Sequence, residues 1–234
     1  MVSKSVAIIT ARGGSKRIPK KNIKLFHGRP IIEYSIQAAL ESGCYDQVMV
    51  STDDYEIREI ALRAGAMVPF MRSDKNSNDY AATHEVLLEV IEEYKKRDQE
   101  FQYLTCIYPT APFVTAQKLR TSMSMLMEQN VDTVIPVVAF SFPPQRGVVI
   151  REGKVSFQSP ENMFVRSQDL ESIYHDCGQF YSLNVKQFLE QKRILMDSTI
   201  PYIMSELEVQ DIDNETDWLL AELKYKIMME NLRK

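Results

Sequence analysis

The chain has 234 residues, a net charge of −4 and an apolar content of 44%. This length and composition fit one globular domain with an ample core. The net negative charge argues against general nucleic-acid binding, and no apolar stretch approaches the roughly 20 residues that span a bilayer. The cysteines Cys44, Cys106 and Cys177 show no metal-ligand spacing or pairing pattern, which predicts a reducing, cytoplasmic environment. Because Met1 to Lys4 lead directly into the first expected strand, we expect no signal peptide.

Strands and helices alternate along the first part of the chain. We expect strands at 6–9, 48–52, 103–108 and 133–140. We expect helices from Pro30 to Gly43, from a cap at Asp53 to Gly65, from Asp79 to about Lys96, and at 116–128. This alternation predicts an α/β fold of Rossmann-like type, with a mostly parallel sheet and helices on both faces.

The pattern changes between residues 141 and 176, where no amphipathic helix of good length is visible. Residues 147–157 indicate a hairpin that turns at Glu152-Gly153. We interpret the stretch as a small β-rich insert within a single domain covering 1–234. The parallel pattern then resumes with strands at 178–184 and 202–205. A helix at about 214–232 follows, and we assign its apolar positions Leu219, Leu223 and Ile227 to the core.

A basic, glycine-containing loop follows the first strand. Gly13 and Gly14 let backbone N–H groups turn toward an anion. Six cations surround them: Arg12, Lys16, Arg17, Lys20, Lys21 and Lys24. The loop fits neither a Walker loop nor a dinucleotide fingerprint. It predicts a nucleotide-phosphate site at the carboxyl end of the strand, and the alternative is a solvated basic turn.

Two carboxylates two residues apart precede the last expected helix. In extended backbone Asp211 and Asp213 point the same way, and such a pair can hold Mg²⁺ together with phosphate oxygens. The alternative, which the spacing alone favours, is that Asp213 caps the helix and Asp211 is solvated.

The run from Ala11 to Asn22, Ala-Arg-Gly-Gly-Ser-Lys-Arg-Ile-Pro-Lys-Lys-Asn, resembles the opening of the cytidylyltransferases that activate nine-carbon acidic sugars. The resemblance implies that Asp211 and Asp213 hold Mg²⁺. It implies phosphate contacts in catalysis from Arg12, Lys16 and Lys21. It implies a nucleotide site that includes Ala11, Gly13, Gly14, Ser15, Asn22, Arg72 and Thr83. Without this resemblance, the sequence would equally allow Arg72 to be a surface cation.

Two later segments resemble one branch of this family. Tyr108-Pro-Thr-Ala-Pro stands where sialic-acid enzymes tend to have Gln before the first proline. The runs 166–171 and 174–181 are similar to those of the branch that activates pseudaminic acid. The sugar contacts that we expect are Tyr108, Gln145, Arg166, Gln168, His175 and Gln179. Arginine can clamp a carboxylate and glutamine can satisfy amides, whereas His175 beside Asp176 could be structural.

The resemblance therefore implies a CTP-dependent enzyme that makes a CMP-sugar and pyrophosphate, most simply from pseudaminic acid. Sialic or legionaminic acid is the alternative acceptor. It further implies a homodimer built through the insert, with no nucleic-acid or membrane partner. Two alternatives of other classes are a nucleotide-sugar-dependent glycosyltransferase, which would release a nucleotide, and a non-catalytic nucleotide-binding module.

Overall fold

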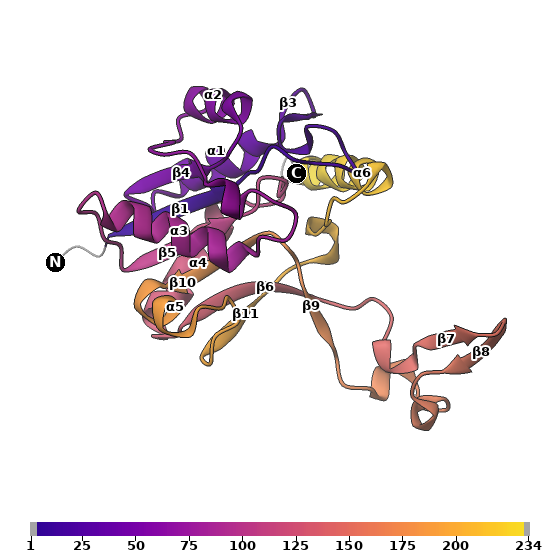
Figure 1. The fold of residues 1–234 in the computed structure, drawn as a ribbon. Helices are drawn as coiled ribbons and strands as arrows, with labels where there is room; N and C mark the ends of the chain where they lie inside the picture. The colour runs from indigo at the N-terminus through magenta and orange to yellow at the C-terminus, as the bar shows by residue number, and fades with distance from the viewer. Residues whose placement is uncertain (1–3, 232–234) are drawn as a thin grey trace.

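The computed structural model describes residues 4–231, and a central sheet runs through its body (Figure 1). The spatial order of its strands is β11 (Thr199–Ile203), β6 (Thr133–Ala139), β10 (Phe180–Asn184), β5 (Tyr103–Ile107), β1 (Ser5–Thr10) and β4 (Gln47–Ser51). A further strand, β9 (Tyr174–Asp176), pairs with β6. Within these strands only β9 and β10 run against the rest. The sheet is mostly parallel, as the sequence predicts.

The expectation that β10 continues the parallel pattern is wrong. It pairs antiparallel with both β5 and β6. Only Cys177, Gly178 and Gln179 separate it from β9, and β9 and β10 follow one another along β6 in the same direction. Because β9 runs antiparallel to β6 and the chain continues along the same edge, β10 keeps the direction of β9 and is antiparallel to β6 as well.

Helices cover both faces of the sheet (Figure 1). On one face α1 (Ile32–Ser42), α2 (Tyr55–Arg63) and α4 (Ala116–Glu128) pack against Ala7 and Ile9 of β1. On the other face α3 (Thr83–Lys95) and α5 (Val185–Gln191) pack against Val6 and Ile8. Since successive strand residues point to opposite faces, an unbroken apolar run is what a strand covered on both sides requires.

Three helix boundaries differ from the sequence prediction. Pro30 belongs to the two-residue strand β3 (Arg29–Pro30), which pairs with β2 (Leu25–Phe26), so α1 begins later. Asp54, rather than Asp53, caps α2, because its Oδ1 accepts hydrogen bonds from the N–H groups of Glu56 and Ile57. Helix α3 begins at Thr83, which leaves Asp79 in the preceding loop.

The last helix, α6 (Glu215–Asn231), packs beside the β2–β3 hairpin and the carboxyl end of the sheet. Its buried residues are Trp218 and Ala221. Leu219, Leu223 and Ile227 are exposed, so assigning them to the core was wrong; Leu219 is 56% exposed. Apolar residues lie on several sides of this helix, and periodicity alone could not choose the buried side. Its predicted end at 232 lies outside the described residues, as do Met1, Val2 and Ser3.

The insert projects from the body as an arm (Figure 1). It carries the predicted hairpin, β7 (Val148–Arg151) and β8 (Lys154–Phe157), with Glu152 and Gly153 at φ 52° and 75° in the turn. Positive φ at both central residues is the geometry of a tight hairpin turn. The last residues assigned to the insert form β9 and so belong to the main sheet. No helix within residues 4–231 is long and apolar enough to cross a membrane.

Candidate active site

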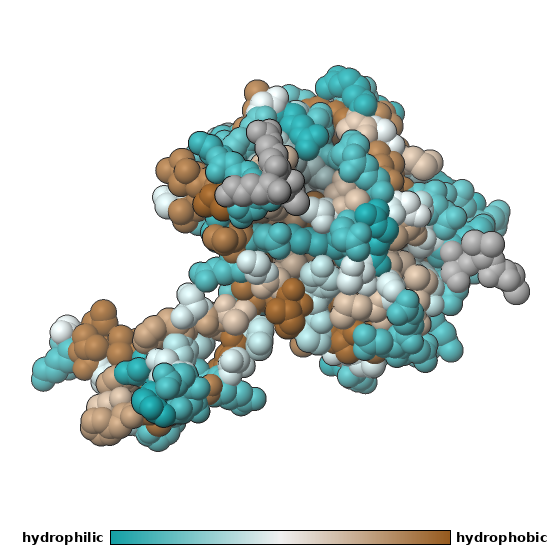
Figure 2. Space-filling model, turned by 180° about the vertical axis from the view of Figure 1, so that it is seen from behind, coloured by the Kyte–Doolittle hydropathy of each residue, from teal (hydrophilic) through white to brown (hydrophobic). Residues whose placement is uncertain are grey.

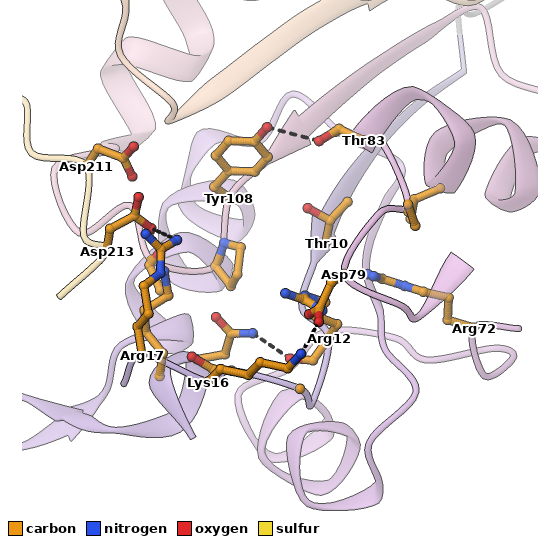
Figure 3. Close-up of a pocket in the computed structure, with 18 residues that line it drawn as sticks. Thr10, Arg12, Lys16, Arg17, Arg72, Asp79, Thr83, Tyr108, Asp211 and Asp213 are labelled. Carbon is orange, nitrogen blue, oxygen red and sulfur yellow. Dashed lines mark hydrogen bonds and ion pairs between the residues drawn. The ribbon is translucent and has the colours of Figure 1, made fainter. Parts of the chain in front are cut away.

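A cavity of about 540 Å³ opens where β1 and β5 end and α6 begins (Figure 3). Its lining includes eleven of the residues predicted from sequence: Arg12, Gly14, Ser15, Lys16, Lys21, Asn22, Arg72, Thr83, Tyr108, Asp211 and Asp213. Ligands of open α/β sheets bind at this edge, outside the carboxyl ends of the strands. The fold thus brings the phosphate-loop, nucleoside and carboxylate candidates together in one place.

The loop after β1 is held by the end of β4. Asp53 Oδ1 accepts a hydrogen bond of 2.9 Å from the N–H of Gly13. A Cβ at Gly13 would lie 2.7 Å from Asp54 Oδ2, so this position requires glycine. The neighbouring Ala11 is buried and donates its N–H to Ser51 O at 2.9 Å. Ala11 and Gly13 therefore shape the loop from behind, and neither lines the cavity.

One wall of the cavity pairs two cations with one acid. Arg12 Nη1 lies 2.5 Å from Asp79 Oδ1, and Lys16 donates to the other carboxylate oxygen (Figure 3). The hydrogen bonds from Lys16 and Arg12 lower the pKa of Asp79. All three groups are solvent-accessible, so these pairs are weak and can exchange for another anion.

The opposite wall carries the two carboxylates that the sequence singles out (Figure 3). Ile212 between them is buried, which turns Asp211 and Asp213 toward the cavity. Arg17 Nη2 lies 2.7 Å from Asp213 Oδ1, and Lys21 donates to Ile212 O at 2.5 Å. Burial, and then the like charge of Asp213, raise the pKa of Asp211. Two carboxylates that disfavour each other's charge are a setting that a bound cation would relieve.

Two buried polar side chains form the inner part of the cavity. Arg72 donates to Ser51 Oγ at 3.0 Å and to Ser51 O at 2.5 Å. Burial lowers the pKa of its guanidinium to about 10, so it is charged at neutral pH. Asn22 donates from Nδ2 to Arg12 O at 2.8 Å. Arg72 is therefore a fixed, buried cation rather than a mobile surface one.

Tyr108 and Thr83 divide this cavity from a second one. Their hydroxyl groups lie 3.0 Å apart, and both residues line both cavities. The second cavity, also about 540 Å³, is lined by His175 and by Asp176, whose Oδ2 accepts a 2.7 Å hydrogen bond from Tyr181. Burial raises the pKa of Tyr181 and keeps its hydroxyl protonated. His175 contacts the carbonyl of Asp176 through Nδ1 at 2.9 Å.

Four of the expected sugar contacts line neither cavity. Gln145 and Arg166 lie in the insert, where they bond Glu171 O and the carboxylate of Asp169, and Gln168 is exposed there. Gln179 is buried, and its Nε2 donates to Glu208 O at 2.7 Å. Within one chain, therefore, the sugar candidates fall into two separate groups, those on the insert and those beside Tyr108.

Sequence reasoning missed three residues of the site. Asp79 was placed at the start of a helix, although it lies in the loop before α3; Arg17 was counted among the loop cations without a role of its own, and Asp53 was treated as a cap. Arg17 belongs to the group of cations in the first loop, which the sequence shows. Only the folded structure shows that it faces Asp213. No cluster of three or more His, Cys, Asp or Glu residues with metal-binding geometry occurs in the described part of the chain.

The chain resembles known proteins along nearly its whole length. A cytidylyltransferase family model matches residues 6–217. A pseudaminic acid cytidylyltransferase from Campylobacter jejuni is 37% identical, covering 97% of this chain and 99% of its own. A CMP-N,N'-diacetyllegionaminic acid synthase from Legionella pneumophila is 31% identical, covering 97% and 98%. Among solved structures, CMP:2-keto-3-deoxy-manno-octonic acid synthetase complexed with CTP has a TM-score of 0.67 at 17% identity, covering 97% of this chain and 100% of the other.

Proposed function

The chain belongs to the cytidylyltransferase family, and on that premise we propose that it couples CTP to pseudaminic acid, giving CMP-pseudaminic acid and pyrophosphate. The observation that carries the proposal is the likeness to the pseudaminic acid cytidylyltransferase of Campylobacter jejuni, which spans nearly the whole length of both chains. The cavity geometry supports it, because a basic glycine loop faces a pair of carboxylates across a space large enough for a nucleotide.

The reaction is an in-line displacement at the α-phosphorus of CTP. The oxygen of the sugar's anomeric hydroxyl forms the new bond to phosphorus as the bond to pyrophosphate breaks, and the hydroxyl proton passes to solvent or a nearby base. Arg12, Lys16 and Lys21 neutralise charge on the phosphates as pyrophosphate leaves, and the loop N–H groups orient them. No covalent enzyme intermediate is needed.

Asp211 and Asp213 suit Mg²⁺ as two carboxylates on one wall of the cavity, and the pKa of Asp211 is raised. When bound, the cation supplies charge stabilisation at the reacting phosphates. Arg17 and Lys21, which pair with Asp213 at 2.7 and 3.7 Å, would then turn toward phosphate oxygens.

The nucleoside half of CTP would lie against Asn22 and Arg72. Arg72 is fixed by two bonds to Ser51, so its guanidinium presents donors in one orientation. Cytosine offers acceptors at its ring and carbonyl positions, and a buried, immobile donor discriminates between bases better than a mobile one. Thr83 lies beside this group on the cavity wall.

The acceptor sugar would occupy the second cavity, beyond Tyr108 and Thr83. Its lining combines apolar Ile194 and Leu195 with polar Asp176 and His175, which suits a sugar bearing methyl and amide groups. Tyr108 stands between nucleotide and sugar and would contact both. The proposal places the reaction in the cytoplasm, which supplies CTP.

We further propose that the enzyme is a homodimer whose arms complete each other's sugar sites. The insert exposes large apolar side chains, among them Ile150 (74% exposed), Val155 and Phe164, on an arm that carries no core of its own. Figure 2 shows these hydrophobic patches gathered on the projecting arm. Exposed apolar surface of this kind marks an interaction site. Gln145, Arg166 and Gln168 would then reach the sugar site of the second copy.

A pyrophosphate-release assay with CTP tests the proposal. Pseudaminic acid should give a higher kcat/KM than legionaminic or sialic acid. A higher value for either of the other acids would overturn the choice of sugar and leave the cytidylyltransferase activity intact. Release of CDP and phosphate in place of pyrophosphate would favour a hydrolase. No reaction with CTP, but release of a nucleotide from a nucleotide sugar, would favour a glycosyltransferase. CTP binding without turnover of either would favour a sensing module.

A further inference from the structure

We propose that Lys118, a buried lysine of α4 outside both cavities, is a positioning residue that sets the place of Asp211 by holding Glu208. The inference rests on the proposed function only in treating Asp211 and Asp213 as the Mg²⁺ ligands. It assigns a role to a buried ammonium group that the reaction itself does not use.

The segment that carries the two carboxylates has no regular secondary structure from Val209 to Asp213. It leaves the short helical turn at Glu206–Glu208 and ends where α6 begins. A segment without a ladder of backbone hydrogen bonds is positioned by the side chains that bind its ends. The geometry of Asp211 therefore depends on what fixes Glu208 on one side and Ile212 on the other.

Lys118 fixes the first of these ends. Its side chain is 10% exposed, and Nζ donates to Phe113 O at 2.9 Å and lies 3.2 Å from Glu208 Oε2. Burial lowers the pKa of the ammonium group, and Glu208 opposes this effect. A buried cation that loses its carboxylate is strongly unfavourable. Lys118 thus holds Glu208 in one place more firmly than an exposed pair could.

Two further donors act on the same few residues. Gln179 Nε2 donates to Glu208 O at 2.7 Å, and Lys224 of α6 donates to Val209 O at 2.7 Å. Through Lys224 the segment is tied to α6, and through Gln179 to the strand that begins at Phe180. This arrangement also gives Gln179 a structural role in place of the sugar contact expected from sequence.

The other end is fixed by packing. Ile212 is buried among Phe26, Phe113 and Trp218, and its carbonyl accepts from Lys21 at 2.5 Å. Only Gln210 and Asp211 lie between the two anchored parts. Because the connection is short, a shift of Glu208 moves Asp211 as well. Metal sites lose affinity when the groups that orient their ligands are removed.

Lys118→Met tests the role, because methionine keeps the apolar stem and removes the charge. We expect the Mn²⁺ dissociation constant, measured by electron paramagnetic resonance with CTP present and no acceptor, to rise about tenfold. The Mg²⁺ concentration for half-maximal kcat should rise in parallel. KM for CTP at saturating Mg²⁺ should stay within about twofold, since Lys118 lines neither cavity.

Ser122→Ala is the matched control. Ser122 lies on the same helix, is buried, and donates to Ser182 Oγ at 2.8 Å. It should lower Tm through a lost buried hydrogen bond while leaving Mn²⁺ affinity unchanged. Equal metal affinity in Lys118→Met and Ser122→Ala would overturn the proposal. Should Lys118→Met not fold, Glu208→Ala removes the same contact from the exposed side, and unchanged Mn²⁺ affinity there would overturn the proposal equally.

Asp211→Asn separates this proposal from the metal assignment. If Asp211→Asn weakens Mn²⁺ binding and Lys118→Met does not, the positioning role is wrong and the metal site stands. If neither variant changes Mn²⁺ binding, the assignment of the metal to Asp211 is itself wrong. Weakened binding in both, with Ser122→Ala unaffected, is the expected result.

Discussion

Asp79 accepts a hydrogen bond of 2.5 Å from the guanidinium of Arg12, and its second oxygen pairs with Lys16. A carboxylate thus pairs with two of the cations that the proposed triphosphate site would use. In the proposed site, the CTP phosphates would compete with the Asp79 carboxylate for Arg12 and Lys16.

Asp79→Asn should therefore lower KM for CTP by about two- to fivefold, because exposed ion pairs are weak and are easily replaced by another anion. The effect should shrink as salt is added. Glu56→Gln is a matched control, since it removes one acid beside the same loop but releases only Lys20, and it should leave KM nearly unchanged. A rise in KM for Asp79→Asn would instead mean that Asp79 itself contacts the nucleotide.

The sequence left open whether Asp213 caps the last helix. The structure assigns that role to Asn214, whose Oδ1 accepts from the N–H groups of Thr216 and Asp217 at 2.9 and 3.1 Å. Asp213→Asn should consequently leave Tm close to that of the parent and lower kcat by about 10²-fold or more, as expected for lost metal charge stabilisation. Steady-state kinetics beside a thermal melt measures both. Unchanged turnover would remove Asp213 from the metal site.

The raised pKa of Asp211 predicts a stability change with a definite sign. Its charged form is disfavoured in the fold by burial and by Asp213. The metal-free protein is therefore penalised above the raised folded pKa, and the penalty disappears as pH falls below the ordinary value of 3.8. Because solvent screens the exposed Asp211 carboxylate, Asp211→Asn should raise the Tm of the metal-free protein at neutral pH by only ~1 °C, with no gain at acid pH. Melts in a chelator across pH measure this, and a lower Tm at neutral pH would contradict it.

Local patterns predicted most of the fold. The apolar runs of β1 and β4, the helix at 116–128 and the hairpin turn at Glu152-Gly153 each follow from residues adjacent in sequence, and the structure agrees with them. The family resemblance is confirmed by the cytidylyltransferase model and by relatives that match along almost the whole chain. These features need no knowledge of which distant residues meet.

The errors arise where distant residues decide. The direction of β10 depends on the insert returning to β6, and the burial of α6 depends on Phe26 and Trp218 meeting across the molecule. In the sequence, Lys118 is one charged residue among others in a predicted helix. Only the fold places Glu208 beside it. In the site, sequence could propose Arg12 and Asp211 separately, but their arrangement across one cavity required the structure.

The cations of the first loop should differ in their contribution to turnover. Lys21 is partly buried and donates to Ile212 O between the two carboxylates, whereas Lys20 is exposed and pairs with Glu56. Alanine substitution should lower turnover severely at Arg12, Lys16 and Lys21. It should lower turnover only mildly at Lys20 and Lys24. Lys21→Ala should lower kcat more than it weakens CTP binding, and Lys20→Ala should change turnover only a few-fold. A flat profile over the five positions would mean diffuse anion attraction.

The exposed hairpin of the insert provides the test of the dimer. Ile150 and Val155 pair across β7 and β8 and present apolar surface to solvent in the single chain. Ile150→Asp should dissociate the dimer, measured by light scattering, because a charge cannot be buried unpaired in an apolar contact. Lys154→Asp places the same side chain at a polar position of the hairpin and should keep the dimer. The monomer should still bind CTP, since that cavity lies within one chain. Its kcat/KM for the sugar should fall by about tenfold or more, because Gln145, Arg166 and Gln168 of the second copy no longer reach the sugar site. A monomer with full activity would show that the sugar site is complete within one chain.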